Sequence, residues 1–360
     1  MKIMTVMGTR PEIIRLSVLL KAFENYGIDN FTIYTNQNFH ESLSTIFIEE
    51  LGVKIDHFID KCPNTDLKKW IENLNFNIEK LIKEYRPDFF LVLGDTNSAL
   101  SAFVAKKYEI PIVHLESGNR SFDMKMPEER NRIQIDHISD FLLPYTENSK
   151  ENLIREGVDE KKIFVSGNPI VDVLSEYSGK IKKSKILKEL NLKPQEYFLV
   201  TIHRNENTEN NLILKNIVEG INLVSSHYHM PVIWGMHPRT NSKIQDSNLV
   251  FDKNVKILSS FDFFNFVMLE QNAYMILTDS GTVQEEASLF NVPTVTVRNS
   301  TERPETIWCK SNILSGTENP NKILEATKVM AVADKNWISP YIKDGGFSNR
   351  VINFLKNTFK

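Results

Sequence analysis

Cysteine is scarce in this sequence, because 360 residues contain only Cys62 and Cys309. Two cysteines cannot build a disulfide framework, which excludes a disulfide-stabilised secreted domain and predicts a cytoplasmic protein. Basic charge is not in excess either, since the net charge is −3, and this disfavours nucleic acid as a partner. Long apolar runs are also lacking. The run at 89–93 is far shorter than a membrane span, and the first residues match a strand and a charged turn rather than a signal peptide, so no membrane partner is expected.

The residues that are present are typical of a globular protein with two domains. Hydrophobic residues make up 41% of the chain and charged residues 25%, and a length of 360 residues fits about two domains. Helical patterns alternate with short apolar runs, and the runs are expected to be strands at 88–93, 112–115, 197–202, 231–235, 274–278 and 293–297. This alternation predicts an α/β protein with two Rossmann-like, doubly wound parallel sheets.

The boundary between the two domains is expected near a lysine-rich helical stretch at 180–192, after which the strand pattern restarts. We predict an N-terminal domain over 1–170 and a C-terminal domain over 171–344. The final helical segment, 345–360, is expected to pack back on the first domain. Ligands of doubly wound folds bind at the carboxyl ends of the strands, so we expect a site between the domains.

Two glycine turns join an apolar strand to a helix, one in each half of the chain. The first is Gly8-Thr9-Arg10-Pro11-Glu12, and the second begins Asp279-Ser280-Gly281. Such a turn places the free N–H groups of a helix where they can hold an anion. Two turns of this kind suggest a phosphorylated ligand. Arg10 and Arg15 could balance the charge of a pyrophosphate, or they could be surface arginines beside a helix start.

Three carboxylates in the first half are candidates for acid and base chemistry. Asp95 and Glu116 each follow a buried strand, and Glu128 opens a helix. Carboxylates gathered at one sheet edge would repel each other, which raises pKa values and suits proton transfer. Structural alternatives exist: Asp95 could cap the next helix, and Glu128 could be a favourable charge in a first helical turn.

The second half offers candidates for holding a nucleotide. Ser280 and Gly281 could bind phosphate, Glu286 could accept hydrogen bonds from ribose hydroxyls, and Arg303 lies in a second charged loop. His203 and His237 could bind phosphate or move protons, or they could be structural. The histidine spacing matches no metal motif, so no metal site is predicted.

Taken together, nine segments of the chain resemble the non-hydrolysing UDP-N-acetylglucosamine 2-epimerase family. In chain order they are GTRPEIIRLS, GDTNSAL, HLESGNR, PEERNR, GNPIVDVL, TIHRNEN, HPRT, TDSGTVQEEA and STERPE. The resemblance implies a two-domain fold like that of GT-B glycosyltransferases, with the site in the interdomain cleft. It implies a UDP-sugar substrate, no metal or NAD cofactor, a homodimer, and a role in supplying a precursor of capsule, O-antigen or another bacterial surface polysaccharide.

The resemblance also implies a mechanism. A base removes the C2 proton of the sugar while UDP leaves from C1, which gives 2-acetamidoglucal. UDP then adds back, and a proton is delivered to the opposite face of C2. By motif matching, the carboxyl candidates are Asp95, Glu116 and Glu128, and His203 matches a catalytic histidine near the phosphates. The UDP-binding positions that match are Arg10, Arg15, Ser280, Gly281 and Glu286.

Several positions depart from the UDP-N-acetylglucosamine enzymes, namely Arg15, the segment Gln37-Asn38-Phe39, Ser117, Asn119, Asn205 and Thr282. Four stretches resemble a subgroup that forms UDP-N-acetyl-L-fucosamine. They are Arg15, Gln37-Asn38-Phe39, Asn97-Ser98 and Gly118-Asn119-Arg120. A 2-epimerase of a UDP-2-acetamido-2,6-dideoxy-L-hexose is therefore the alternative function. More distant alternatives are a GT-B glycosyltransferase, a hydrolysing 2-epimerase and a nucleotide-sugar sensor.

Overall fold

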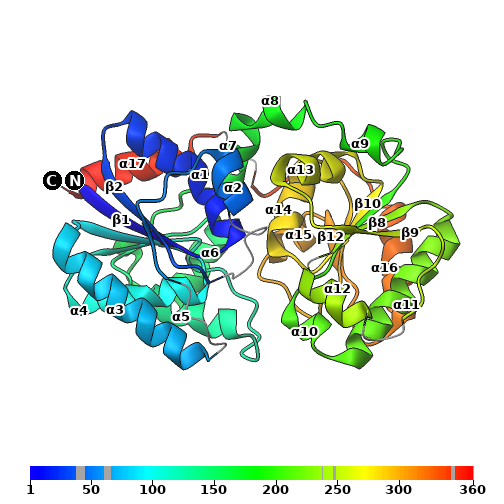
Figure 1. Cartoon of the computed structure of the whole chain (residues 1–360), viewed down its shortest axis with the longest axis horizontal. Helices are drawn as coiled ribbons and strands as arrows, with labels where there is room; N and C mark the ends of the chain where they lie inside the picture. The colour runs from blue at the N-terminus through cyan, green and yellow to red at the C-terminus, as the bar shows by residue number, and fades with distance from the viewer. Residues whose placement is uncertain (38–44, 61–65, 237, 246–248, 342–344, 360) are drawn as a thin grey trace. The chain divides into compact units, whose positions relative to one another are not determined.

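The chain divides into two compact units. The computed structural model describes residues 1–37, 45–60, 66–236, 238–245, 249–341 and 345–359, without the side chains of residues 238, 239 and 245. Unit 1 comprises Met1–Glu176 and Lys343–Lys360, and unit 2 comprises Tyr177–Ile342 (Figure 1). The unit boundary at 176/177 lies a few residues after the expected boundary at 170/171.

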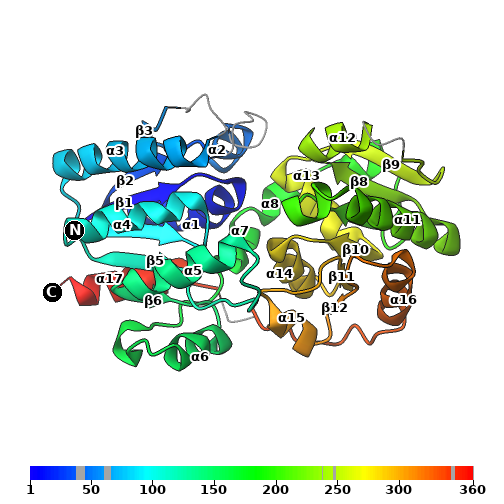
Figure 2. The same cartoon turned by 90° about the horizontal axis from the view of Figure 1, so that it is seen from below.

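Unit 1 is built on a six-stranded parallel sheet with the order β3-β2-β1-β4-β5-β6, which can be followed in Figure 2. Most residues of its strands are buried, because helices cover both faces of the sheet. The strands are β1 (Lys2–Met7), β2 (Asp29–Tyr34), β3 (His57–Phe58), β4 (Phe89–Leu93), β5 (Ile112–Leu115) and β6 (Phe141–Leu143).

The helices of unit 1 lie on both faces of this sheet. They are α1 (Arg10–Asn25), α2 (Thr45–Leu51), α3 (Leu67–Tyr85), α4 (Ala102–Lys107), α5 (Pro127–Ile138), α6 (Glu147–Arg155), α7 (Pro169–Glu176) and α17 (Phe347–Thr358), with 3-10 turns η2 (Asn97–Ser101) and η3 (Glu160–Lys162). Figure 1 shows α1 and α17 on one face and α3, α4 and α5 on the other.

Helix α17 completes unit 1 although it comes from the end of the sequence. Its Phe354 stacks on Phe164, with ring centroids 4.9 Å apart. Asp172 on α7 accepts hydrogen bonds from the Gly346 N–H at 2.7 Å and the Ser348 N–H at 3.1 Å. The last helix is therefore held to unit 1 by both apolar and polar contacts.

Unit 2 repeats the architecture with the strand order β12-β11-β10-β7-β8-β9. Its strands are β7 (Phe198–Thr201), β8 (Val232–Met236), β9 (Val255–Ser259), β10 (Met275–Thr278), β11 (Thr294–Thr296) and β12 (Asn312–Leu314). Its helices are α8 (Ser178–Ile181), α9 (Ile186–Glu189), α10 (Asn205–Thr208), α11 (Asn211–Tyr228), α12 (Pro238–Gln245), α13 (Phe263–Asn272), α14 (Gly281–Leu289), α15 (Pro304–Trp308) and α16 (Pro320–Ala331).

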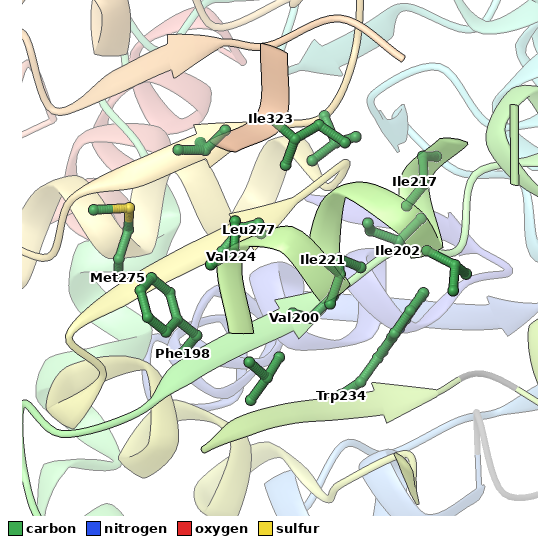
Figure 3. Close-up of a cluster of buried hydrophobic side chains, with 14 of the residues drawn as sticks. Phe198, Val200, Ile202, Ile217, Ile221, Val224, Trp234, Met275, Leu277 and Ile323 are labelled. Atoms are coloured by element: carbon green, nitrogen blue, oxygen red, sulfur yellow. The ribbon is translucent and has the colours of Figure 1, made fainter. Parts of the chain in front are cut away.

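The core of unit 2 lies between its sheet and the helices α11 and α16. Figure 3 shows Phe198, Val200 and Leu277 of the sheet facing Ile221 and Val224 of α11. A second apolar cluster fills the other face, where side chains of α9, α13 and α14 meet the sheet. Both faces are therefore buried, as expected for parallel strands.

Both sheets have the doubly wound order that the sequence predicts, so the fold prediction is confirmed. In each unit, the first strand pairs with the fourth: β1 with β4, and β7 with β10. Between these two neighbouring strands the order of strands along the sheet reverses. The loop that follows the first strand therefore lies beside the loop that follows the fourth strand of the same unit. The predicted site residues should therefore be sought at the carboxyl ends of these strands. No described helix is long and apolar enough to cross a membrane.

Candidate functional site

Unit 1 places its predicted site residues at the carboxyl end of its sheet. Asp95 follows β4 directly, and Glu116 follows β5. Arg10 and Arg15 lie on the first turns of α1, which follows β1, and Glu128 lies in the first turn of α5. The glycine turn and the two strand ends thus converge on the point where β1 and β4 are neighbours.

Glu116 is a buried carboxylate that forms an ion pair with Arg15; the two side chains are 7% and 3% exposed. Its Oε2 atom also accepts a hydrogen bond from the Tyr145 hydroxyl at 3.3 Å, and its Oε1 atom accepts one from Asn119 Nδ2 at 3.4 Å. The backbone of Glu116 has a φ of 64°, a left-handed conformation that few non-glycine residues adopt. The surroundings therefore hold this carboxylate in one orientation.

Asp95 is more accessible than Glu116 and forms an ion pair with Arg132 of α5; the Asp95 side chain is 20% exposed. Arg132 also donates a hydrogen bond to Glu129 Oε2 at 2.6 Å. Glu129 in turn accepts hydrogen bonds from the Ser121 and Phe122 N–H groups, which orders the loop between β5 and α5. Arg132 therefore links Asp95 to the loop that begins after Glu116.

The expectation of three mutually repelling carboxylates needs correction. Asp95 and Glu116 each face an arginine, so their negative charges are balanced within unit 1. Glu128 is half-buried in the first turn of α5, where the helix dipole favours a negative charge. Arg10 is half-buried, and its guanidinium lies 5.4 Å from the ring centroid of Phe47.

Glu12 is a buried carboxyl that sequence analysis did not single out as a site residue. Its Oε2 atom accepts hydrogen bonds from Gly8 N at 3.0 Å, Thr9 N at 2.8 Å and Thr9 Oγ1 at 2.7 Å. Its Oε1 atom accepts one from Thr96 Oγ1 at 2.9 Å, which ties the loop after β1 to the loop after β4. Burial raises the pKa of Glu12 to about 7, and these hydrogen bonds oppose the rise.

Replacing Glu12 with glutamine should make the stability of unit 1 less dependent on pH. A raised pKa favours the protonated carboxyl, so its stabilising contribution is complete below about pH 4.5 and is lost as pH rises through about 7. The shift corresponds to about 3 kcal/mol. Urea unfolding between about pH 5 and about pH 8 should therefore show a steeper fall in stability for the native chain than for Glu12→Gln. Glu24→Gln, an exposed change on the same helix, should leave the slope unchanged. Equal slopes for all three proteins would contradict the prediction.

Unit 2 organises its site around Asp279, which follows β10 and is fully buried. Its Oδ2 atom accepts hydrogen bonds from His203 N at 3.0 Å, Arg204 N at 2.9 Å and Asn207 Nδ2 at 3.0 Å. His203 Nδ1 lies 3.4 Å from Asp279 Oδ1, and the side chain of His203 is 36% exposed. Asp279 therefore fixes the loop after β7 and orients a partly accessible imidazole.

Ser280 and Gly281 lie at the N-terminus of α14, the nine-residue helix that follows β10. Ser280 Oγ lies 2.9 Å from Thr282 Oγ1, which places two hydroxyls beside the first N–H groups of the helix. Glu286, in the next turn of the helix, is 5% exposed. A helix start of this kind can hold an anion, and the binding role of Ser280 and Gly281 stays a prediction.

A group of ion pairs lies against the start of α14. Glu302 contacts Arg204 and Arg298, each at 2.9 Å. Arg303, predicted as a binding residue, forms an ion pair with the buried Glu285. Arg303 thus has a structural partner within unit 2. His237 lies outside the described residues.

Sequence reasoning missed several residues of these two clusters. Arg132 and Glu129 were missed as partners of the site, although their spacing of three on one helix was a usable signal. Asp279 was seen only as part of a motif, and Glu302 only as part of a charged loop. No local signal links Glu302 to Arg204, because the two residues are far apart in sequence. Among the described residues, no group of three or more His, Cys, Asp or Glu side chains is arranged to hold a metal ion.

Comparison with known proteins identifies the family to which the chain belongs. The sequence profile of the family described as UDP-N-acetylglucosamine 2-epimerase matches residues 21–356. The UDP-N-acetylglucosamine 2-epimerase of Methanocaldococcus jannaschii is 41% identical over 364 residues, which cover 99% of each chain. The UDP-2,3-diacetamido-2,3-dideoxy-D-glucuronate 2-epimerase of Pseudomonas aeruginosa is 37% identical over 320 residues, which cover 88% of each chain.

A solved structure extends this agreement to three dimensions. The crystal structure of the M. jannaschii enzyme in complex with UDP-GlcNAc and UDP matches with a TM-score of 0.93 and 41% identity, and the match covers 99% of this chain and 100% of that one. The resemblance inferred from nine short motifs is therefore confirmed over nearly the whole chain. The chain belongs to the UDP-N-acetylglucosamine 2-epimerase family and is an isomerase of the nucleotide-sugar 2-epimerase type.

Proposed function

We propose that this protein interconverts UDP-N-acetylglucosamine and UDP-N-acetylmannosamine without hydrolysing the nucleotide sugar. The observation that carries the proposal is the full-length likeness to an enzyme whose structure holds UDP-GlcNAc and UDP. The two clusters support it, because one unit offers carboxylates paired with arginines and the other offers an anion-binding helix start. We assign the sugar to unit 1 and the UDP to unit 2.

The proposed reaction balances as an elimination followed by an addition. A carboxylate takes the C2 proton, the C2–H electrons form a C1=C2 double bond, and the C1–O bond breaks with its electrons on the departing UDP. UDP then attacks C1 of the 2-acetamidoglucal, and a second acid delivers a proton to the other face of C2. Two faces require at least two proton-carrying groups, which we assign to the set Asp95, Glu116 and Glu128.

Cationic and N–H donors are needed where negative charge develops on the departing UDP. We assign this role to Arg10, Arg15, the Ser280 hydroxyl and the N–H groups that follow it from Gly281 onward, with Glu286 accepting from the ribose hydroxyls. His203 is assigned to the phosphates as a proton carrier, because Asp279 orients its imidazole. Arg303 and His237 complete the proposed UDP contacts.

The direct test is proton NMR of the purified protein with UDP-N-acetylglucosamine in D2O. Deuterium at C2 together with a growing UDP-N-acetylmannosamine signal is the expected result, because the proton removed from C2 exchanges with solvent before another is delivered. Free UDP with free sugar would show hydrolysis instead, and no exchange at all would overturn the proposed substrate.

The departures around Glu116 favour one second candidate, a 2-epimerase of a UDP-2-acetamido-2,6-dideoxy-L-hexose. Arg15 and Asn119, which both depart from the UDP-N-acetylglucosamine enzymes, contact the Glu116 side chain directly. Gln37 and Ser98, which both lie in stretches that resemble the subgroup, contact each other, because Gln37 Oε1 accepts hydrogen bonds from Ser98 N at 2.9 Å and Ser98 Oγ at 2.8 Å. Asn38 and Phe39, which differ from the UDP-N-acetylglucosamine enzymes, lie outside the described residues. The same NMR assay with the 6-deoxy-L-sugar nucleotide separates the candidates by which substrate exchanges at C2.

We further infer that the enzyme works in the cytoplasm as a homodimer and supplies a precursor of a bacterial surface polysaccharide, such as capsule or O-antigen. The inference rests on the family and on the scarcity of cysteine. Sedimentation of the purified protein tests the dimer. Loss of the 2-acetamido-mannose or fucosamine unit from the polysaccharide of a deletion strain tests the biosynthetic role.

Replacing Gly281 with alanine is expected to weaken UDP binding about tenfold, or about 1.4 kcal/mol. A Cβ atom there would lie 2.6 Å from Glu302 Oε1, and Glu302 cannot move away without leaving Arg204 and Arg298. The clash should therefore displace the N–H groups proposed to hold phosphate. Calorimetric titration with UDP measures the effect. Gly179→Ala, a helical change in unit 2 with open space around the new Cβ, should bind UDP normally, and equal affinities for both variants would contradict the prediction.

A further inference from the structure

Two buried residues of unit 1, His114 of β5 and Asp136 of α5, lie beside the loops that carry the proposed catalytic carboxylates. We call these the Asp95 loop, which follows β4, and the Glu116 loop, which follows β5. Neither side chain has a role in the proposed reaction. His114 Nε2 lies 2.8 Å from the carbonyl oxygen of Gly94, the residue before Asp95. Since a carbonyl only accepts, Nε2 is the donor in this hydrogen bond. His114 Nδ1 lies 2.8 Å from Asp136 Oδ1.

The second oxygen of Asp136 reaches the loop after Glu116. Asp136 Oδ2 accepts a hydrogen bond from Gly118 N at 3.1 Å and forms an ion pair with Arg120 at 2.7 Å. Arg120 also donates to the Asn119 carbonyl at 2.7 Å. One carboxylate thus contacts the Glu116 loop directly and holds the Asp95 loop through His114.

Burying this charged group costs free energy, because Asp136 and Arg120 are almost completely removed from water. Burial alone would raise the pKa of Asp136, yet contacts with His114 and Arg120 lower it below its usual range, so the carboxyl is ionised. Glu156, the residue after α6, lies 2.6 Å from Arg120, and His137 lies 3.6 Å from Glu156. Buried ionic groups are often less stabilising than apolar residues of similar volume. Stability alone therefore does not account for this buried charged group.

The backbone at Glu116 needs such support, whereas the glycines nearby adopt positive φ without strain. Gly94 and Gly118 have φ values of 70° and 74°, and Glu116 has one of 64°. A left-handed non-glycine residue persists when its surroundings hold it there. We propose that Asp136 and His114 are positioning residues that fix the Asp95 and Glu116 loops relative to each other. The inference rests on the proposed function, because it assigns the proton-transfer chemistry to those two carboxylates.

The first test compares three variants in the C2-exchange assay. Asp136→Ala removes both links and should lower kcat about 100-fold while KM changes little, since small displacements of reacting groups carry costs of this size. Asp136→Asn retains the size and hydrogen-bonding capacity of the side chain and should recover most of the lost turnover. Asp140→Ala is the matched control, because Asp140 also accepts from a backbone N–H, that of Ile112, and pairs with Lys106 at the other end of β5. It should retain native kcat.

The second test applies if Asp136→Ala does not fold. His114→Gln can place an amide nitrogen near the position of Nε2 and still donate to Gly94 O, whereas the shorter His114→Asn cannot reach it. We expect kcat to fall much further in His114→Asn than in His114→Gln, with UDP affinity equal in both. Equal kcat values in this pair, native turnover in Asp136→Ala, or an equal loss in Asp140→Ala would overturn the inference. An inactive native chain would instead overturn the proposed function, so the two failures are distinguishable.

Discussion

Replacing Asp95 with asparagine is expected to lower kcat for epimerisation about 100- to 10,000-fold, the range typical of a lost general acid or base. Asparagine has the same shape and can still accept a hydrogen bond from Arg132, so unit 1 should remain folded. The amide cannot take or deliver the C2 proton. Deuterium exchange at C2 should therefore fall together with product formation, and UDP affinity should stay within about twofold, because Asp95 is not among the residues that we assign to UDP.

The matched control for this change lies at the opposite end of the same strand. Asp88 precedes β4 and accepts a hydrogen bond from Lys2 N at 2.6 Å, so Asp88→Asn also exchanges a carboxylate for an amide beside β4. Asp88→Asn should retain native kcat. If Asp95→Asn also retains native exchange and turnover, Asp95 takes no part in proton transfer, and the assignment passes to Glu116 and Glu128.

Replacing Asp279 with alanine is expected to destabilise unit 2 by about 3 kcal/mol or more. The fully buried carboxylate accepts from His203 N, Arg204 N and Asn207 Nδ2, and its removal leaves these donors without their acceptor. Each buried donor left unsatisfied costs about 1–3 kcal/mol. Urea unfolding followed by tryptophan fluorescence measures the effect. Unit 2 contains Trp234, Trp308 and Trp337, and unit 1 contains Trp70.

The expected signature of Asp279→Ala is a shift of the unit 2 transition to lower urea, with the unit 1 transition unchanged, because separate units need not unfold together. Asp252→Ala provides the comparison. Asp252 accepts from Ser225, Ser226 and Asn254 but is partly exposed, so water can replace it as a partner for those donors. It should cost less than half as much. If Asp279→Ala lowers the free energy of unfolding no more than Asp252→Ala does, burial is not what makes the Asp279 hydrogen bonds important.

Much of the fold could be predicted because its signals are local. Strands β5 and β10 coincide closely with the expected runs, since an apolar run between helical patterns is visible without knowledge of its neighbours. The segment just before α4, by contrast, is not α-helical but forms the 3-10 turn η2. Ser98 N and Oγ both donate to Gln37 Oε1, a contact across 61 positions that no local pattern reveals. The pairing of β1 with β4 is non-local in the same way.

The site was predictable to the extent that it follows strand ends. The placement of Asp95 and Glu116 could be predicted because polar residues after buried parallel strands gather at one edge of a sheet. Their partners were not found, because Arg132 lies 37 positions from Asp95 and Arg15 lies 101 positions from Glu116. The partners changed the electrostatic interpretation, since an arginine nearby favours the ionised form of a carboxyl group, whereas a second carboxylate nearby disfavours it.

The return of α17 to unit 1 has a consequence for biosynthesis. A ribosome must make all of unit 2 before it makes the helix that packs beside α1 and stacks Phe354 on Phe164. Until then the nascent first unit exposes the apolar surface that α17 will cover, including Phe141, whose ring centroid lies 5.6 Å from that of Phe354. Unit 2 is continuous in sequence and has no such delay. The order of translation therefore allows the second unit to be completed first, and the first unit is completed only after α17 has been made.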